Sequence, residues 1–243
     1  MSNLEKVMKD FQNIGEEKQA DIILDFSEAF KNKNNCKSGE FFTEFGKRYK
    51  SLKWSEFVNN HNFMVSNGAD ESALDNLFKR FPKNTNIDEV YIKVLAINSL
   101  YHTYLCNSEN GKNLSMKEMA RHIFKNACDI DDTSKVSPIK IVDRLGNKDN
   151  LNGDVNNAYS FASKYLSFTY RNKPNGKDLV PITDTNAREV LKFMNLSKVH
   201  NLENYSNYYA AITELKNKYS QINKSIGYKE IDAFLWIMGK AFR

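Results

Sequence analysis

The sequence has little glycine, proline or cysteine. Its 243 residues include 10 Gly, 4 Pro and 3 Cys, which is few for a chain of this length. Apolar residues recur at helical spacing rather than in strict alternation, and this pattern predicts an all-α fold. The apolar content of 41% suffices for a hydrophobic core, which argues against a disordered chain.

The chain also lacks a long hydrophobic run. It has no apolar stretch of the roughly 20 residues that a membrane-spanning helix needs. It has no charged start followed by a short apolar core either, so we expect no signal peptide. We therefore expect a cytoplasmic protein without a membrane partner. The net charge of +5 is moderate and by itself only permits an anionic partner.

The three cysteines, Cys36, Cys106 and Cys128, are odd in number and widely spaced. This arrangement fits reduced cytosolic thiols better than a disulfide framework. A metal site would require His102, Cys106, His122 and Cys128 to converge. None of these four lies in a tight CxxC or HxxxH pair, so we expect no zinc site.

Helical patterns of apolar residues cover most of the chain. We predict one two-lobed domain over 1–243, with a central helical lobe at 87–200 and flanking helices in 1–86 and 201–243. Pro82 should end one helix, and Lys83 to Asn86 reads as a linker between the lobes. The main predicted helices span 3–13, 16–33, 87–105, 115–126, 139–145, 205–222 and 227–242.

One stretch, Ser160 to Asp184, combines an apolar helix, a turn and an acidic residue in an unusual order. Its sequence is SFASKYLSFTYRNKPNGKDLVPITD. Lys164 lies inside the helical pattern, a turn rich in Pro, Asn and Gly follows, and Asp184 stands 20 residues after the lysine, where the next helix should begin. An Asp at that position is a natural helix N-cap. The interval allows the chain to fold back, so that both side chains can meet at a cleft.

This order, with a short helix at 139–145 and a polar connection before the lysine helix, resembles the helix-hairpin-helix DNA glycosylases. The similarity is greatest to the lysine-bearing, 8-oxoguanine type. In that type a catalytic lysine on the second hairpin helix precedes an essential aspartate by about this interval. The aspartate there follows a Val-Pro pair much like Val180-Pro181. The resemblance covers roughly Ile139 to Leu191.

Two departures from the family pattern stand out. The family's hairpin usually carries a Gly-x-Gly whose amides bind a DNA phosphate, whereas the stretch Asn147 to Asn157 contains only Gly153 and is longer. Many relatives carry four cysteines after the aspartate for an iron-sulfur cluster. No cysteine follows Cys128 here, so we expect neither a cluster nor another cofactor.

The resemblance implies a glycosylase that flips a damaged or modified base out of double-stranded DNA. Lys164 would attack the anomeric carbon of the sugar and form a Schiff base, and elimination could then nick the strand. For this attack the amine must be neutral. Asp184 would stabilise the positive charge that develops on the sugar, and it could help to orient or deprotonate the nucleophile.

Residues around this pair are candidates for contacts with the base and the DNA. Phe161 and Phe168 share the helix face of Lys164 and could stack on the flipped base, with Phe234, Trp236 or Met238 of the last helix as partners. By position, His102 and Tyr104 could fill the gap left by that base. The candidates for contacts with the phosphate backbone are Lys140, Arg144, Lys148, Arg171, Lys173 and Lys177.

Plainer interpretations exist for each of these residues. Lysines on helices are usually solvated, Phe161 and Phe168 fit a hydrophobic core, and basic loop residues are often merely solubilising. The chain could therefore be a non-catalytic helix-hairpin-helix DNA-binding module or an unrelated helical interaction protein. For the enzyme, expected to be a monomer, two substrates stay open. They are 8-oxoguanine, as in repair, and a glucosylated hydroxymethylcytosine of phage DNA, as in anti-phage defence.

Overall fold

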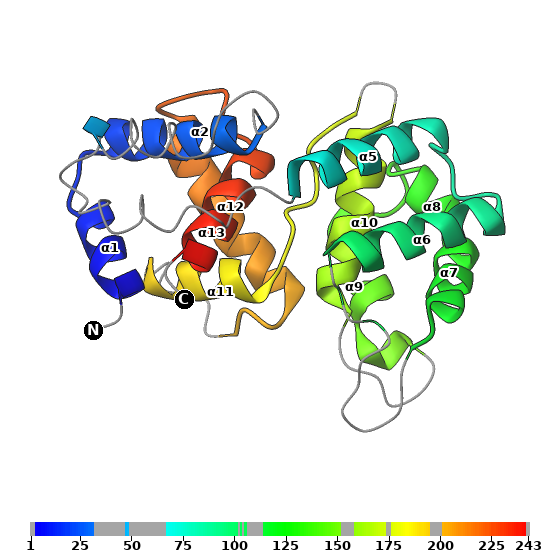
Figure 1. The fold of residues 1–243 in the computed structure, drawn as a ribbon. Coiled ribbons are helices and arrows are strands. Elements are labelled where there is room, and N and C mark those ends of the chain that lie inside the picture. The colour runs from blue at the N-terminus through cyan, green and yellow to red at the C-terminus, as the bar shows by residue number, and fades with distance from the viewer. Residues whose placement is uncertain are drawn as a thin grey trace. The chain divides into compact units, whose positions relative to one another are not determined.

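The structure is a computed structural model, and it describes residues 3–31, 47–48, 67–101, 103, 105, 114–151, 158–173, 176–194 and 201–241. Within these residues the regular structure is helical (Figure 1). This confirms the all-α prediction. None of the described helices is long and apolar enough to cross a membrane. Aromatic residues at helical spacing also predict two short helices at 41–49 and 54–61, but these stretches lie largely outside the described residues.

The chain divides into two compact units. Unit 1 combines residues 1–69, 184–203 and 210–243, and unit 2 combines residues 70–183 and 204–209. The boundary differs from the predicted one, because unit 2 begins well before residue 87. The stretch predicted as a linker lies inside unit 2, where the Asn84 side chain is fully buried.

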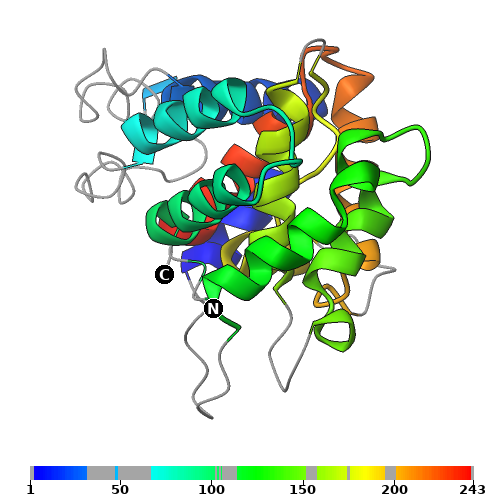
Figure 2. The ribbon, with the colours of Figure 1, turned by 90° about the vertical axis from the view of Figure 1, so that its right-hand side faces the viewer.

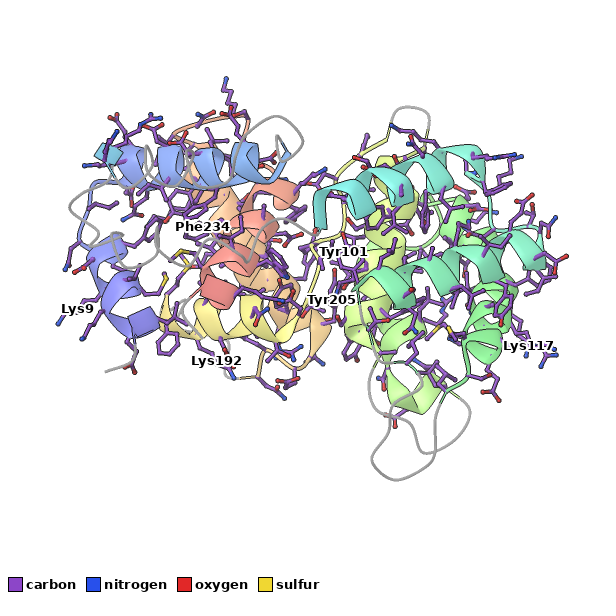
Figure 3. The ribbon with its side chains drawn as sticks, in the orientation of Figure 1. Lys9, Tyr101, Lys117, Lys192, Tyr205 and Phe234 are labelled. Atoms are coloured by element: carbon purple, nitrogen blue, oxygen red, sulfur yellow. The ribbon has the colours of Figure 1, made fainter. Side chains whose placement is uncertain are left out.

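Unit 1 is built from amphipathic helices that bury aromatic side chains. Helix α13 packs on both α2 and α11, and α1 contacts α11. The Phe234 ring of α13 lies 5.2 Å from the Phe11 ring and 5.6 Å from the Phe26 ring, and Figure 3 labels Phe234 inside the unit. The helices are α1 (Asn3–Gln12), α2 (Glu16–Lys31), α11 (Thr185–Phe193), the greater part of α12 (Tyr205–Ser220) and α13 (Tyr228–Ala241).

The helices of unit 2 pack around one buried helix, α10 (Tyr159–Arg171). Nearly every α10 side chain from Tyr159 to Tyr170 is buried, polar ones included. Helices α6 and α9 pack against α10, and Figure 1 shows α10 in yellow-green among its neighbours. The other helices are α5 (Asn67–Arg80), α6 (Ile87–Tyr101), α7 (Met116–Lys125), α8 (Ala127–Asp131), α9 (Pro138–Gly146) and the short 3-10 helix Lys148–Asn150.

Local signals in the sequence account for several helix ends. Helix α5 stops at Arg80, two residues before Pro82. Helix α7 begins after a capping box in which the Ser115 side chain accepts from the Glu118 amide and the Glu118 side chain accepts from the Ser115 amide. Helix α9 begins with Pro138, whose missing N–H costs nothing in the first turn.

Candidate active site

Lys164 lies near the middle of α10 and is 5% exposed. Its Nζ donates a hydrogen bond to the Ser160 hydroxyl over 2.7 Å and lies 5.3 Å from the centre of the Tyr101 ring. Ser160 is one helical turn before Lys164, and Tyr101 is the last residue of α6. The solvated lysine of the plainer interpretation is therefore not found, and the amine is held inside unit 2.

Asp184 is the N-cap of α11, as its position before Thr185 predicts. Its backbone is extended, and its Oδ1 accepts a hydrogen bond from the Ala187 amide over 2.8 Å. The carboxylate thus satisfies a helix amide that has no partner within the helix. A negative charge at this end is also stabilised by the helix dipole. Lys164 belongs to unit 2, and Asp184 begins a segment of unit 1.

The segment that leads to Asp184 is held within unit 2 by three hydrogen bonds. The Thr183 amide donates to the Ser163 hydroxyl of α10 over 3.1 Å. The hydroxyl groups of Tyr205 and Tyr208 donate to the carbonyls of Pro181 and Ile182 over 2.9 and 2.6 Å. Tyr205 and Tyr208 lie three residues apart at the start of α12, so both reach the same segment. Figure 3 labels Tyr205.

These anchoring residues are not among the predicted site residues. Their signal in the sequence is weak, because Ser163 reads as an ordinary helix serine and the two tyrosines read as core. The partners lie 20 to 26 residues away in the chain, and hydropathy patterns do not reveal such pairs. Thr183 is also 2% exposed, and within the described residues its hydroxyl has no hydrogen-bond partner.

The two helices before the turn, α9 and α10, pack closely against each other. The Ala158 amide donates to the Gly146 carbonyl over 2.7 Å, which joins the end of α9 to the start of α10. A Cβ added at Gly146 would lie 2.6 Å from Cδ1 and 2.9 Å from Cα of Tyr159. Gly146 is therefore required by this close approach. The stretch around Gly153, where the family's Gly-x-Gly is replaced, lies outside the described residues.

The two phenylalanines beside Lys164 are core residues of unit 2. Phe161 is 1% exposed, and its ring stacks on Tyr165 at 6.0 Å. Phe168 is fully buried, with its ring 5.6 Å from Phe78 and 5.9 Å from Tyr101. In this conformation neither ring has an open face for a flipped base. Both residues pack as part of the core, which is their plainer interpretation.

Two of the predicted DNA contacts are engaged in interactions within unit 2. The Arg171 side chain is 14% exposed, pairs with Glu71 and Asp75 at 2.9 Å each, and lies 3.8 Å from the centre of the Phe168 ring. Lys173 donates from Nζ to the carbonyls of Ile130 and Asp131 over 2.9 and 3.0 Å, at the end of α8. These contacts tie the end of α10 to α5 and α8.

The remaining basic candidates differ in their surroundings. Arg144 donates to the Asp129 carboxylate and to the Asn126 side chain, the latter over 3.2 Å. Lys140 on α9 and Lys177 after the turn are exposed. The Lys148 side chain lies outside the described part, although its backbone begins the 3-10 helix. Lys140 and Lys177 are therefore exposed and form no ion pair within the described residues, whereas the Arg144 side chain, 39% exposed, is paired with Asp129.

The other predicted site residues are distant in the chain. Trp236 lies on α13 in unit 1, half-buried, with the Lys240 Nζ 5.2 Å from its ring centre. His102 and Tyr104 lie outside the described residues. The described residues contain no group of His, Cys, Asp and Glu side chains that could hold a metal ion. His122 instead lies with Nε2 3.1 Å from the Arg144 carbonyl.

A second buried lysine, Lys93 on α6, was not foreseen from the sequence. It is fully buried, and its Nζ donates to the carbonyls of Phe81 and Lys83 and to Asn84 Oδ1 over 2.7 to 3.2 Å. Asn84 in turn donates to both carboxylate oxygens of Asp131, through its amide and its side chain. Burial lowers the pKa of Lys93 to about 8, although the negative charge of Asp131 acts to raise it.

The comparison with known families identifies the chain over half of its length. Residues 47–173 match the family model HI_0787_N, which is described as an N-terminal domain. The chain belongs to the HI_0787_N family. No curated protein and no solved structure matches the chain.

The region shared with the HI_0787_N family contains one half of the candidate site. It includes α10 with Lys164 and the Lys93 network, and it ends at Lys173. The segment from Val180 to Asp184 and the tyrosines of α12 lie beyond the match. The family therefore covers most of unit 2 but not the aspartate.

Proposed function

We propose that this protein is a DNA glycosylase in which Lys164 is the nucleophile and Asp184 the essential carboxylate. The proposal rests on the resemblance to the lysine-bearing helix-hairpin-helix glycosylases. Support comes from the burial of Lys164 on the second of two packed helices and from the N-cap position of Asp184. A nucleophilic amine, whose charged form burial disfavours, and a carboxylate that stabilises positive charge are the two groups that this chemistry requires.

The observation that carries the proposal is the hydrogen bond between the Thr183 amide and the Ser163 hydroxyl. Ser163 precedes Lys164 in the chain, and Thr183 precedes Asp184. Because consecutive Cα atoms are about 3.8 Å apart, this bond restricts how far the backbones of the two proposed catalytic residues can separate. One hydrogen bond, between the residues that precede Lys164 and Asp184, therefore bridges the 20 residues that separate them in the sequence.

The proposed reaction begins with the neutral amine of Lys164. Its lone pair forms a bond to the anomeric carbon of the flipped nucleotide, and the N-glycosidic bond breaks. The base leaves with the electron pair of the broken glycosidic bond and takes up a proton. Loss of a proton from the attacking nitrogen and opening of the sugar then give the Schiff base, from which elimination of the 3′ phosphate nicks the strand. Asp184 stabilises the positive charge on the sugar during bond cleavage.

The proposed substrate is a damaged or modified base in double-stranded DNA. The resemblance leaves the same two bases open, 8-oxoguanine and glucosylated hydroxymethylcytosine. A panel of duplexes, each with one modified base, distinguishes them by which base is released. The exposed Lys140 and Lys177 are the described residues that we propose for contacts with the phosphate backbone.

One observation favours a second candidate, a DNA-binding module without catalytic activity. Phe161 and Phe168, the aromatic residues nearest Lys164 along the face of α10, are buried within unit 2. A site that stacks no aromatic ring on its base loses part of the energy that offsets base flipping. Such a module would bind duplex DNA but release no base and form no adduct.

Trapping with borohydride on DNA that contains an abasic site tests the enzyme. A Schiff base to Lys164 would be reduced to a stable adduct, which Lys164→Ala and Lys164→Met should both abolish. Lys9→Ala, at an exposed lysine of α1, is the matched control and should keep the adduct. An adduct that persists in both Lys164 variants would exclude this nucleophile. Base release from a duplex with a modified base, without any adduct on abasic DNA, would indicate a glycosylase that uses water as its nucleophile.

A further inference from the structure

Helix α7 presents a row of cations on the surface of unit 2. Lys117, Arg121 and Lys125 are exposed and four residues apart, so they lie on one side of the helix about 6 Å from each other along its axis. The opposite side, with Met119, Ala120 and Ile123, is buried. Figure 2 shows α7 in green on the side toward the viewer, and Figure 3 shows Lys117 pointing outward.

The row keeps a net positive charge, although Arg121 interacts electrostatically with Glu118 on the same helix. None of the three cations forms an ion pair within the described residues. Glu118, the acidic residue of α7, accepts from the Ser115 amide in the capping box. Like charges four residues apart destabilise a helix, so the row is unfavourable for α7 by itself. An anionic partner would remove that repulsion.

One aromatic side chain accompanies the cations. Phe124 is 40% exposed and lies within the same arc of the helix, between Arg121 and Lys125 in sequence. An exposed ring among basic residues can pack on sugars or bases while the cations contact phosphates. A membrane fits less well, because the apolar side of α7 is buried in unit 2 and cannot enter a bilayer.

We propose that the face formed by Lys117, Arg121, Phe124 and Lys125 binds the phosphate backbone of duplex DNA. The row is about 12 Å long, and a duplex carries one charge per roughly 1.7 Å of its axis, so several phosphates face the row in any register. The contact is therefore independent of sequence. It is separate from the chemistry of Lys164 and Asp184 and adds a binding surface that the candidate site does not include.

Binding of an unmodified, fluorescein-labelled duplex tests the proposal, followed by anisotropy over a series of salt concentrations. The variant Lys117→Gln/Arg121→Gln/Lys125→Gln should bind at least about tenfold more weakly near physiological salt. The slope of log K against log salt should fall by about 2 to 3, because each lost phosphate contact removes about 0.9. All three side chains are exposed and their mutual repulsion is removed, so the variant should melt at or slightly above the wild-type temperature.

A charge-matched control separates local contacts from net charge. Lys6→Gln/Lys9→Gln/Lys18→Gln removes the same three charges from exposed positions of unit 1, and both triple variants have a net charge of 5 − 3 = +2. The control should bind within about twofold of the wild type, as expected for charges that contact no phosphate. Equal losses in both variants, or no loss in the α7 variant, would overturn the proposal.

Two further measurements fix the partner and the relation to catalysis. Vesicles that contain phosphatidylserine should bind the wild type and the α7 variant equally weakly; tight binding that the α7 substitutions abolish would assign the face to a membrane instead. If the borohydride adduct is absent while the α7 variant loses affinity, the proposed function fails and the DNA-binding face stands.

Discussion

At the residue scale, two substitutions separate the capping role of Asp184 from its proposed catalytic role. Asn caps helices as well as Asp, so Asp184→Asn should keep the free energy of unfolding within a few tenths of a kcal/mol, whereas Asp184→Ala should lose about 1 kcal/mol. If the charge stabilises the transition state, both should release the base at least about 100-fold more slowly. Urea unfolding and single-turnover base release measure the two effects. Full activity in Asp184→Asn would contradict the mechanism.

Single residues of the candidate site also differ in how far the sequence predicts their surroundings. The N-cap role of Asp184 could be predicted because a cap depends on a few neighbouring residues. The surroundings of Phe168 and Arg171 could not be predicted in this way. Helix α10 is buried on nearly all sides, and periodicity then gives no direction to a side chain. Residues that share the face of Lys164 on a helical wheel can therefore be core, as Phe168 is.

At the scale of the elements, the contact between α9 and α10 depends on Gly146. Gly146→Ala places a methyl group within 2.6 to 3.0 Å of Tyr159, including its backbone, so the two helices must move apart. We expect a loss of about 1 to 3 kcal/mol in the free energy of unfolding, as for other overpacked cores. Urea unfolding followed by circular dichroism measures it.

Gly15→Ala provides the control for this effect. No atom lies within 4 Å of the position that a Cβ would occupy at Gly15. The substitution should therefore leave stability within about 0.5 kcal/mol of the wild type, or raise it slightly by restricting the unfolded chain. Equal losses of stability in the two variants would mean that the close approach at Gly146 does not determine how α9 and α10 pack.

The segment before Asp184 gives a second prediction at this scale. Ser163→Ala removes the acceptor of the Thr183 amide, which is buried, so the variant should lose about 1 to 2 kcal/mol. Hydrogen exchange of that amide should accelerate, and base release should slow if the bond positions Asp184. Ser167→Ala, at another buried serine of α10, is the control and should leave Thr183 exchange unchanged. Unchanged exchange in Ser163→Ala would show that the bond does not hold the segment.

At the scale of the whole molecule, helix positions were easier to predict than the division into units. Capping residues and prolines determine where α5, α7 and α9 begin or end, and these are local signals. The boundary depends instead on partners far apart in the chain. Asn84 looks like part of a linker, yet Asp131 and Tyr165 bind it from 47 and 81 residues away and hold the stretch inside unit 2. The composition of the sequence does not predict such long-range hydrogen bonds.

The buried lysine and tyrosines together predict an unusual dependence of stability on pH. The pKa of Lys93 is lowered to about 8 in the folded protein from an ordinary value of 10.5, so the unfolded chain binds more protons between these values. The free energy of unfolding should therefore rise by about 2 kcal/mol from about pH 8 to about pH 10. Burial raises the pKa values of Tyr159, Tyr165, Tyr170 and Tyr219, and their effect has the opposite sign. They remain protonated in the folded state while the unfolded chain loses its protons, so stability should fall above about pH 10.

Urea unfolding across this range, for the wild type and for Lys93→Met, tests the assignment. The methionine keeps an unbranched side chain in the same space but removes the titrating amine. It also leaves three acceptors without their donor, so the variant should be less stable at every pH. Its stability should not rise between about pH 8 and about pH 10, whereas the fall at higher pH should persist. A rise that survives in Lys93→Met would assign it to another group, of which Lys173 is the first candidate, because burial lowers its pKa as well.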